Sequence, residues 1–270
     1  MNGQANGNEK APAVQVSNLA RDQSGAYVPS RALELIPEIV PILHTFLSGD
    51  MKEADEQLKN GDPRGETLYY SLGRCVIESL KAFMSFEHAD LRDAIEISKH
   101  CGAVSQAHRR HVTSMASRIS GFISRSTSGT AWIKGMNDVE RHAELCYQEH
   151  LLIKAVLGIL YSGDWFQFIK EALHLRSANI AYRTMNEFLR EADVAADGYD
   201  NLIDQHFRSG VMFGVAMNSL ILSLLPHRVL ALAQLFGYEG NRTESLKLLY
   251  AIGGWTKDSD EPMVGNRRRV

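Results

Sequence analysis

The chain has 270 residues, a formal net charge of −3, 44% hydrophobic residues and 23% charged residues. This composition is ordinary for a globular protein and excludes disorder of the whole chain, because enough apolar residues are present to bury a core. The weak net charge gives no overall field that would favour nucleic acid or an anionic membrane as a partner.

The first block of the chain is predicted to be helical after a disordered tail at residues 1–28, which is polar and lacks periodicity. Apolar residues then recur at helical spacing across 30–47, and the predicted buried stripe is Leu33, Ile36, Val40, Leu43 and Leu47.

Two prolines lie inside this first pattern. Pro37 and Pro41 should bend or break the helix, because each lacks a backbone donor. Further helices are expected at 51–59, 65–86 and 91–111, with a turn at 88–90. Small residues in the last of these helices should permit close helix approach; they are Ser98, Gly102 and Ala103. Residues 29–111 are therefore expected to form N-terminal helical hairpins.

Residues 112–137 are rich in Ser, Gly and Thr and contain no acidic residue. We predict a flexible linker there. Helical periodicity resumes in a second repeat block at 138–254, with helices at 138–160, 165–192, 199–225, 226–236 and 243–252. The apolar run at 211–225 is too short to span a bilayer, so a buried helix is expected. Residues 255–270 are predicted to be a disordered tail.

Short connections between helices of similar length force neighbouring helices to run antiparallel. No segment shows the alternation of a β-strand. The predicted fold is all-α: antiparallel helical hairpins stacked as a TPR-like α-solenoid.

Candidate chemical sites are weak. His108 and His111 flank two arginines, which predicts a solvated basic face rather than a metal site. His142, Cys146 and His150 share one helix face, where packing is favoured over metal binding. No nucleophile elbow, phosphate-binding loop or metal motif occurs, so no catalytic, cofactor-binding or metal-binding residues are predicted and the chain is not expected to be an enzyme. A helical enzyme or metal protein remains the least favoured alternative.

The three cysteines are Cys75, Cys101 and Cys146, and they form no C-x-x-C pair. This pattern favours a reducing compartment such as the cytoplasm over a disulfide framework.

Two features of the second block have a structural and a functional interpretation. Arg176 lies in an apolar helix and is either an anchor for a partner carboxylate or, as we favour, half of an internal ion pair with an acid such as Glu171 or Glu144. Gly210 and Gly214 form a G-x-x-x-G spacing, for which close packing of neighbouring hairpins is the favoured interpretation over dimerisation in a membrane.

The later helices carry a specific arrangement of glycines, a Leu-Leu-Pro and an arginine: Gly210, Gly214, Asn218, Leu224, Leu225, Pro226, Gly237, Gly240 and Arg242. Earlier helices read LYYSLGRCVIESLKAFMSFE and RHAELCYQEHLLIKAVLGIL. Together these runs resemble the tetratricopeptide-repeat 39 proteins of animals and their fungal relatives, the inclusion-body clearance proteins. The resemblance covers roughly 30–253 without the linker, and the 255–270 tail does not share it, so we expect this chain to be a shortened version of a longer protein.

The resemblance implies a non-enzymatic protein–protein interaction scaffold. Fungal members are similar to cytoplasmic and nuclear proteins that associate with lipid-droplet proteins and help to clear inclusion bodies after protein-folding stress. Other proteins, including lipid-droplet proteins, are therefore the expected partners, and no nucleic acid or cofactor is expected.

The predicted linker also supports an alternative function as a peripheral lipid-surface adaptor. Bulky apolar residues recur across 112–136 opposite Ser, Thr and Gly, which is typical of helices that sense lipid packing. The predicted lipid contacts are Met115, Ile119, Phe122, Ile123 and Trp132. A disordered, phosphorylatable loop is the competing interpretation of the same stretch.

Overall fold

The computed structural model describes residues 19–109, 129–162, 165–224 and 240–252, with the side chains in these ranges except those at 165–174, 176 and 224. Throughout these ranges the regular structure is helical, and extended pairing is limited to an isolated bridge between Arg21 and Tyr27. The all-α prediction is confirmed.

The N-terminal hairpin starts with a 3-10 helix, η1 (Pro29–Leu35), which continues directly into α1 (Ile36–Leu47) and is followed by α2 (Met51–Gly61). The prolines act differently from each other. Pro37 lies in the first turn of α1, where a backbone donor is not required, and Pro41 is accommodated inside the helix. The expected break therefore appears as a change from 3-10 to α geometry just before Pro37.

The next helices are α3 (Leu68–Ser85) and α4 (His88–His108), followed by the short α6 (Ala131–Lys134). The prediction of a turn at 88–90 was wrong, since these residues form the first turn of α4. Phe86 provides the reversal instead: its φ of 57° is left-handed, and this ends α3.

The second block contains α7 (Asp138–Ser162), α8 (Trp165–Ala195), α9 (Gln205–Leu224) and α11 (Arg242–Ile252). Helix α9 begins later than predicted, because Asp204 caps it: Oδ1 of Asp204 accepts hydrogen bonds from the backbone N–H groups of His206 and Phe207, at 2.8 and 3.0 Å. The predicted helix at 226–236 lies outside the described residues.

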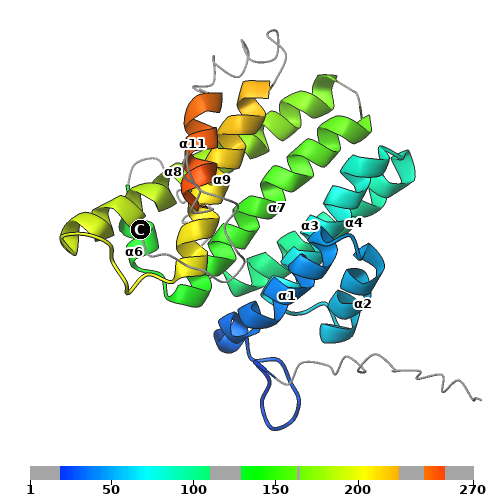
Figure 1. The fold of residues 1–270 in the computed structure, drawn as a ribbon, viewed down its shortest axis with the longest axis horizontal. Coiled ribbons are helices and arrows are strands. Elements are labelled where there is room, and N and C mark those ends of the chain that lie inside the picture. The colour runs from blue at the N-terminus through cyan, green and yellow to red at the C-terminus, as the bar shows by residue number, and fades with distance from the viewer. Residues whose placement is uncertain (1–18, 110–128, 163–164, 225–239, 253–270) are drawn as a thin grey trace, which may run out of the picture.

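Helix α7 occupies the middle of the stack (Figure 1). It packs against α3 and α4 on one side and against α8 and α9 on the other, while α1 and α2 pack on α3 and α11 packs on α9. The two predicted blocks are thus joined by direct packing of α4 on α7.

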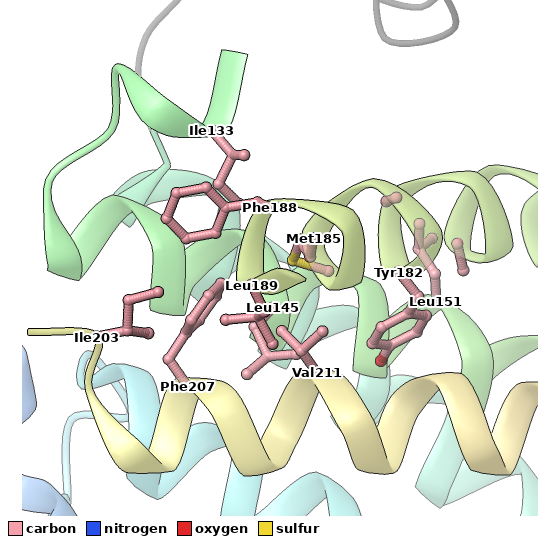
Figure 2. Packing of buried hydrophobic residues seen from close by; sticks show 12 residues of the cluster. Ile133, Leu145, Leu151, Tyr182, Met185, Phe188, Leu189, Ile203, Phe207 and Val211 are labelled. Carbon is pink, nitrogen blue, oxygen red and sulfur yellow. The ribbon is translucent and has the colours of Figure 1, made fainter. Parts of the chain in front are cut away.

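Two segments predicted to be flexible contribute to this packing. Ala20, within the predicted 1–28 tail, is fully buried against the α1–α3 core. Ile133 of α6, within the predicted 112–137 linker, is fully buried among residues of α7, α8 and α9. Figure 2 shows Ile133 above Phe188 in this cluster. The described ends of the two segments, 19–28 and 129–137, are thus ordered parts of the fold, and the rest of each segment lies outside the described residues.

Small residues bring the helices together as predicted at most positions. A Cβ at Gly210 would fall 2.5 Å from Cδ2 of Leu145 on α7, and a Cβ at Gly214 would overlap the ring of Tyr182 on α8. A Cβ at Gly102 of α4 would likewise overlap the His150 ring on α7. Ala103, however, is exposed and takes no part in the contact.

An apolar groove as the candidate functional site

Helix α1 has two apolar faces rather than the single stripe that was predicted. Its buried face is formed by Ile39, Ile42 and Phe46, which pack on α2 and α3. Of the predicted stripe, Leu47 is 74% exposed and Val40 is 38% exposed. The second apolar face, Ile36, Val40 and Leu43, is left to line a groove.

The groove has a volume of about 330 Å³ and opens to solvent. Its walls come from α1 and α9, its floor comes from α3 and α7, which pack on each other between them, and Ile252, the last residue of α11, also lines it. The lining residues are overwhelmingly apolar: Ile36, Ile39, Val40, Leu43, Tyr69, Leu72, Gly73, Val76, Leu145, Glu149, His206, Ser209, Gly210, Phe213 and Ile252. Phe213, on the α9 wall, is 47% exposed. An open apolar groove between helices is a typical binding site for a partner's apolar side chains.

Among the described residues that line this groove, Glu149 is the one carboxyl, and none is a lysine or arginine. The side chain is half-buried, and burial raises the pKa of its carboxyl to about 8. Removal from water causes this shift because it penalises the ionised form. The carboxyl of Glu149 is thus mostly protonated near neutral pH.

Beside the groove, a polar brace links three elements. Tyr69 of α3 shares a hydrogen bond with Nδ1 of the fully buried His142 on α7, and Nε2 of His142 lies 3.2 Å from Oδ1 of Asp204. The His142 imidazole and the backbone N–H of Phe207 hold the pKa of Asp204 well below its usual range. His142 therefore serves to join helices.

The other members of the predicted His142, Cys146 and His150 stripe are also buried. His150 contacts the backbone carbonyl of Tyr147 through Nδ1 at 2.6 Å. Cys146 packs with Cys75 and Cys101 between α3, α4 and α7, and all three thiols are free. Within the described ranges, no three His, Cys, Asp or Glu side chains are grouped as metal ligands would be.

The prediction of a solvated basic face at 108–111 was wrong for His108 and Arg109, while Arg110 and His111 lie outside the described residues. The His108 ring is engaged on both nitrogens, by the Tyr27 hydroxyl at 2.9 Å and the Val104 carbonyl at 2.8 Å. Arg109 donates from Nε to the carboxylate of Glu144 at 2.7 Å, and Glu144 is only 1% exposed. Arg109 is directed to Glu144 rather than to solvent because a buried carboxylate requires a charged partner.

Of the five residues predicted as lipid contacts, the structure describes Trp132. Met115, Ile119, Phe122 and Ile123 lie outside the described residues. Trp132 is half-buried in α6 and packs against the cluster shown in Figure 2. The side chain of Arg176 is also outside the described residues, and Glu144, one of its two expected partners, is paired with Arg109.

Sequence reasoning missed the groove and the place of Glu149 in it. A usable signal was present in 36–47, where apolar residues occupy more than one helical face. Along the described part of the chain, no helix combines the length and apolar character that crossing a membrane would require.

Comparison with known proteins gives a consistent result for most of the chain. Residues 42–258 match the family model described as Iml2/Tetratricopeptide repeat protein 39. Tetratricopeptide repeat protein ttc-39B of Caenorhabditis elegans is 30% identical over 239 residues, which cover 87% of this chain and 39% of the worm protein.

An uncharacterized protein of Schizosaccharomyces pombe is 22% identical over 193 residues, which cover 68% of this chain and 30% of the yeast protein. The chain therefore spans less than half the length of either relative. No solved structure matches it. With four fifths of its length matched by the family model and a 30% identical relative that covers 87% of it, the chain belongs to the Iml2/Tetratricopeptide repeat protein 39 family.

Proposed function

We propose that this protein is a non-enzymatic interaction scaffold that docks an apolar segment of a partner protein in the groove between α1 and α9. The observation that carries this proposal is the open apolar groove itself, in which Val40 of α1 is 38% exposed and Phe213 of α9 is 47% exposed. Exposed apolar surface is costly to maintain, so a concave apolar site with helical walls favours a binding role.

The finer proposal places this scaffold among proteins that associate with lipid-droplet proteins during clearance of inclusion bodies after protein-folding stress, in the cytoplasm and nucleus. Its support is the family membership of the chain. A helical-repeat surface suits such work, because stacked hairpins present grooves to several partners at once.

The test compares partners recovered with the wild-type chain, with Phe213→Asp and with Leu202→Asp. Both substitutions add a carboxylate at an exposed apolar residue, but Leu202 is 90% exposed and outside the groove. We expect Phe213→Asp to lose a set of proteins that wild type and Leu202→Asp both retain, and those proteins to bind the purified chain with the same dependence. Equal recovery by all three variants would contradict the proposal.

The same variants test the finer proposal in cells. After a folding stress, cells that rely on Phe213→Asp should clear inclusions more slowly than cells that rely on Leu202→Asp. If Phe213→Asp lost its partners but the two variants cleared inclusions at the same rate, the scaffold function would stand and the proposed role in inclusion-body clearance would be contradicted.

The alternative function, contact with a lipid surface through 112–136, is a separate proposal. Trp132 supports it least, because that side chain is half-buried and packs against the core cluster. A droplet-flotation assay should therefore use Phe122→Ala, and unchanged flotation would argue against lipid contact.

A further inference from the structure

We propose that the groove selects an amphipathic helical segment with one lysine or arginine among its apolar side chains, and that this cation is placed against Glu149. The inference rests on the docking function proposed above and names the chemistry of the partner. It follows from the residues that line the groove and from what they lack.

The first step concerns the carboxyl itself. Glu149 lies on the floor of the groove, formed there by α7, and the described residues give its side chain no hydrogen bond or ion pair. Elsewhere on this helix, a buried acid is fully paired: Glu144 accepts hydrogen bonds from Arg109 at 2.7 Å and from Gln148 at 2.6 Å. Glu149 thus differs from its neighbour one turn away.

The second step concerns the titratable groups around Glu149. The Tyr69 hydroxyl and Cys75 thiol on α3, the Cys146 thiol on α7 and the Tyr182 hydroxyl on α8 lie within electrostatic range of its carboxyl, and His206 on α9 lines the same groove. The Tyr69 hydroxyl is already bonded to His142. None of these groups has the permanent positive charge of a lysine or arginine, so a cation is the missing complement of this site.

The third step concerns the shape of the occupant. About 330 Å³ is at the low end of the roughly 300–1,000 Å³ typical of ligand pockets, which suits a few side chains better than a whole lipid. One face of a helix presents such side chains at positions i, i+3 or i+4, and i+7. An acyl chain would fill the apolar walls but would leave the carboxyl of Glu149 without a partner.

The raised pKa of Glu149, about 8, supplies a signature for this pairing. A lysine or arginine placed against the carboxyl favours the ionised form, so binding releases a proton near neutral pH. Affinity for a basic peptide should therefore rise between about pH 6.5 and about pH 8.5, whereas affinity for the same peptide with methionine in place of the basic residue should not rise.

The experiment uses a displayed library of helical peptides of about 16 residues, long enough for four turns, selected on the full chain. Peptides that also bind Phe213→Asp are removed. Each remaining peptide is synthesised with its basic residue and with methionine there, and dissociation constants are measured with wild type, Glu149→Gln and Leu202→Asp.

We expect the retained peptides to carry a lysine or arginine flanked by apolar residues. Loss of either charge should weaken the complex about tenfold, and loss of both should weaken it no further, since the two charges act on each other. Leu202→Asp should bind as wild type does.

Three results would overturn the inference. These are groove-dependent peptides without a basic residue, equal affinities for Glu149→Gln and wild type, or displacement of the peptides by an acyl-chain probe that binds more tightly to Glu149→Leu. If no peptide distinguishes wild type from Phe213→Asp, the docking function itself fails, and that outcome is separate from the other three.

Discussion

Gly214 on α9 lies directly against the ring of Tyr182 on α8, so closely that a Cβ atom at residue 214 would overlap the ring. Figure 2 shows the Tyr182 ring directed from α8 toward α9. Since Tyr182 is fully buried, the ring has no solvent to move into. The distance between these two helices is therefore fixed by the absence of one side chain.

Gly214→Ala should lower the free energy of unfolding by about 1–3 kcal/mol, because the added methyl overpacks the contact between α8 and α9. Urea denaturation measures this. Gly73→Ala is the matched control: its Cβ would meet the flexible end of Leu58 at 3.2 Å, and the gain in helix propensity of up to about 1 kcal/mol offsets that contact. If the two variants were equally stable, the close approach at Gly214 would not govern packing.

Asp204 should contribute stability in two separable ways. Its carboxylate caps α9, so Asp204→Ala should cost about 1 kcal/mol more than Asp204→Asn, which keeps a capping oxygen. Its charge also faces His142, which Asp204→Asn removes.

The contribution of the Asp204 charge to the free energy of unfolding should decrease as pH falls. The pKa of Asp204 is lowered in the folded protein, so its contribution is complete above the unfolded value of about 3.9 and is lost as pH falls below it. The stability difference between wild type and Asp204→Asn should therefore shrink between about pH 4.5 and about pH 3. A difference that stayed constant over this range would show that the charge is not involved.

The buried pair Arg109–Glu144 should show strong non-additivity. Arg109→Met leaves the Glu144 carboxylate buried without its cation and should cost about 3–5 kcal/mol. The double variant Arg109→Met, Glu144→Met removes the stranded charge as well and should recover most of that loss. Denaturation of wild type, both single variants and the double variant in parallel measures the coupling. As a control, Arg190→Met breaks an exposed pair on α8 and should cost less than about 1 kcal/mol.

The order and type of the helices could be predicted because the 3.6-residue spacing of apolar residues is a local property of the chain. Close packing at Gly210 and Gly214 was also predictable, since the absence of a side chain is visible in the sequence. The buried face of α1 was not, because apolar residues surround most of that helix and only α2 and α3 determine which of them are covered.

The candidate site was less predictable than the fold for the same reason. Glu149 is notable only because of the helices around it: α1, α3 and α9 form an apolar groove, and their described residues bring no lysine or arginine to it. Arg109 and Glu144 likewise meet only once α4 packs on α7. Local sequence identifies each residue type, whereas charge pairing depends on the tertiary arrangement.

Glu149 should make the protein less stable as pH rises. Burial raises the pKa of its carboxyl from an unfolded value of about 4.3 to about 8, so the folded state holds a proton that the unfolded state has released between these values. The free energy of unfolding should consequently fall across this range through this group. Glu149→Leu should remove the effect and raise stability at about pH 8 by roughly 1–3 kcal/mol.

Urea denaturation at about pH 5, 6.5 and 8 tests this, with Glu96→Gln, an exposed acid on α4, as the control. The direction of the pH effect distinguishes the two groups. Stability that depends on Glu149 falls as pH rises, whereas stability that depends on Asp204 falls only in acid. If wild type and Glu149→Leu kept the same stability difference from pH 5 to 8, the carboxyl would be ionised throughout. The groove would then already satisfy its charge, and an incoming cation would gain little by pairing with it.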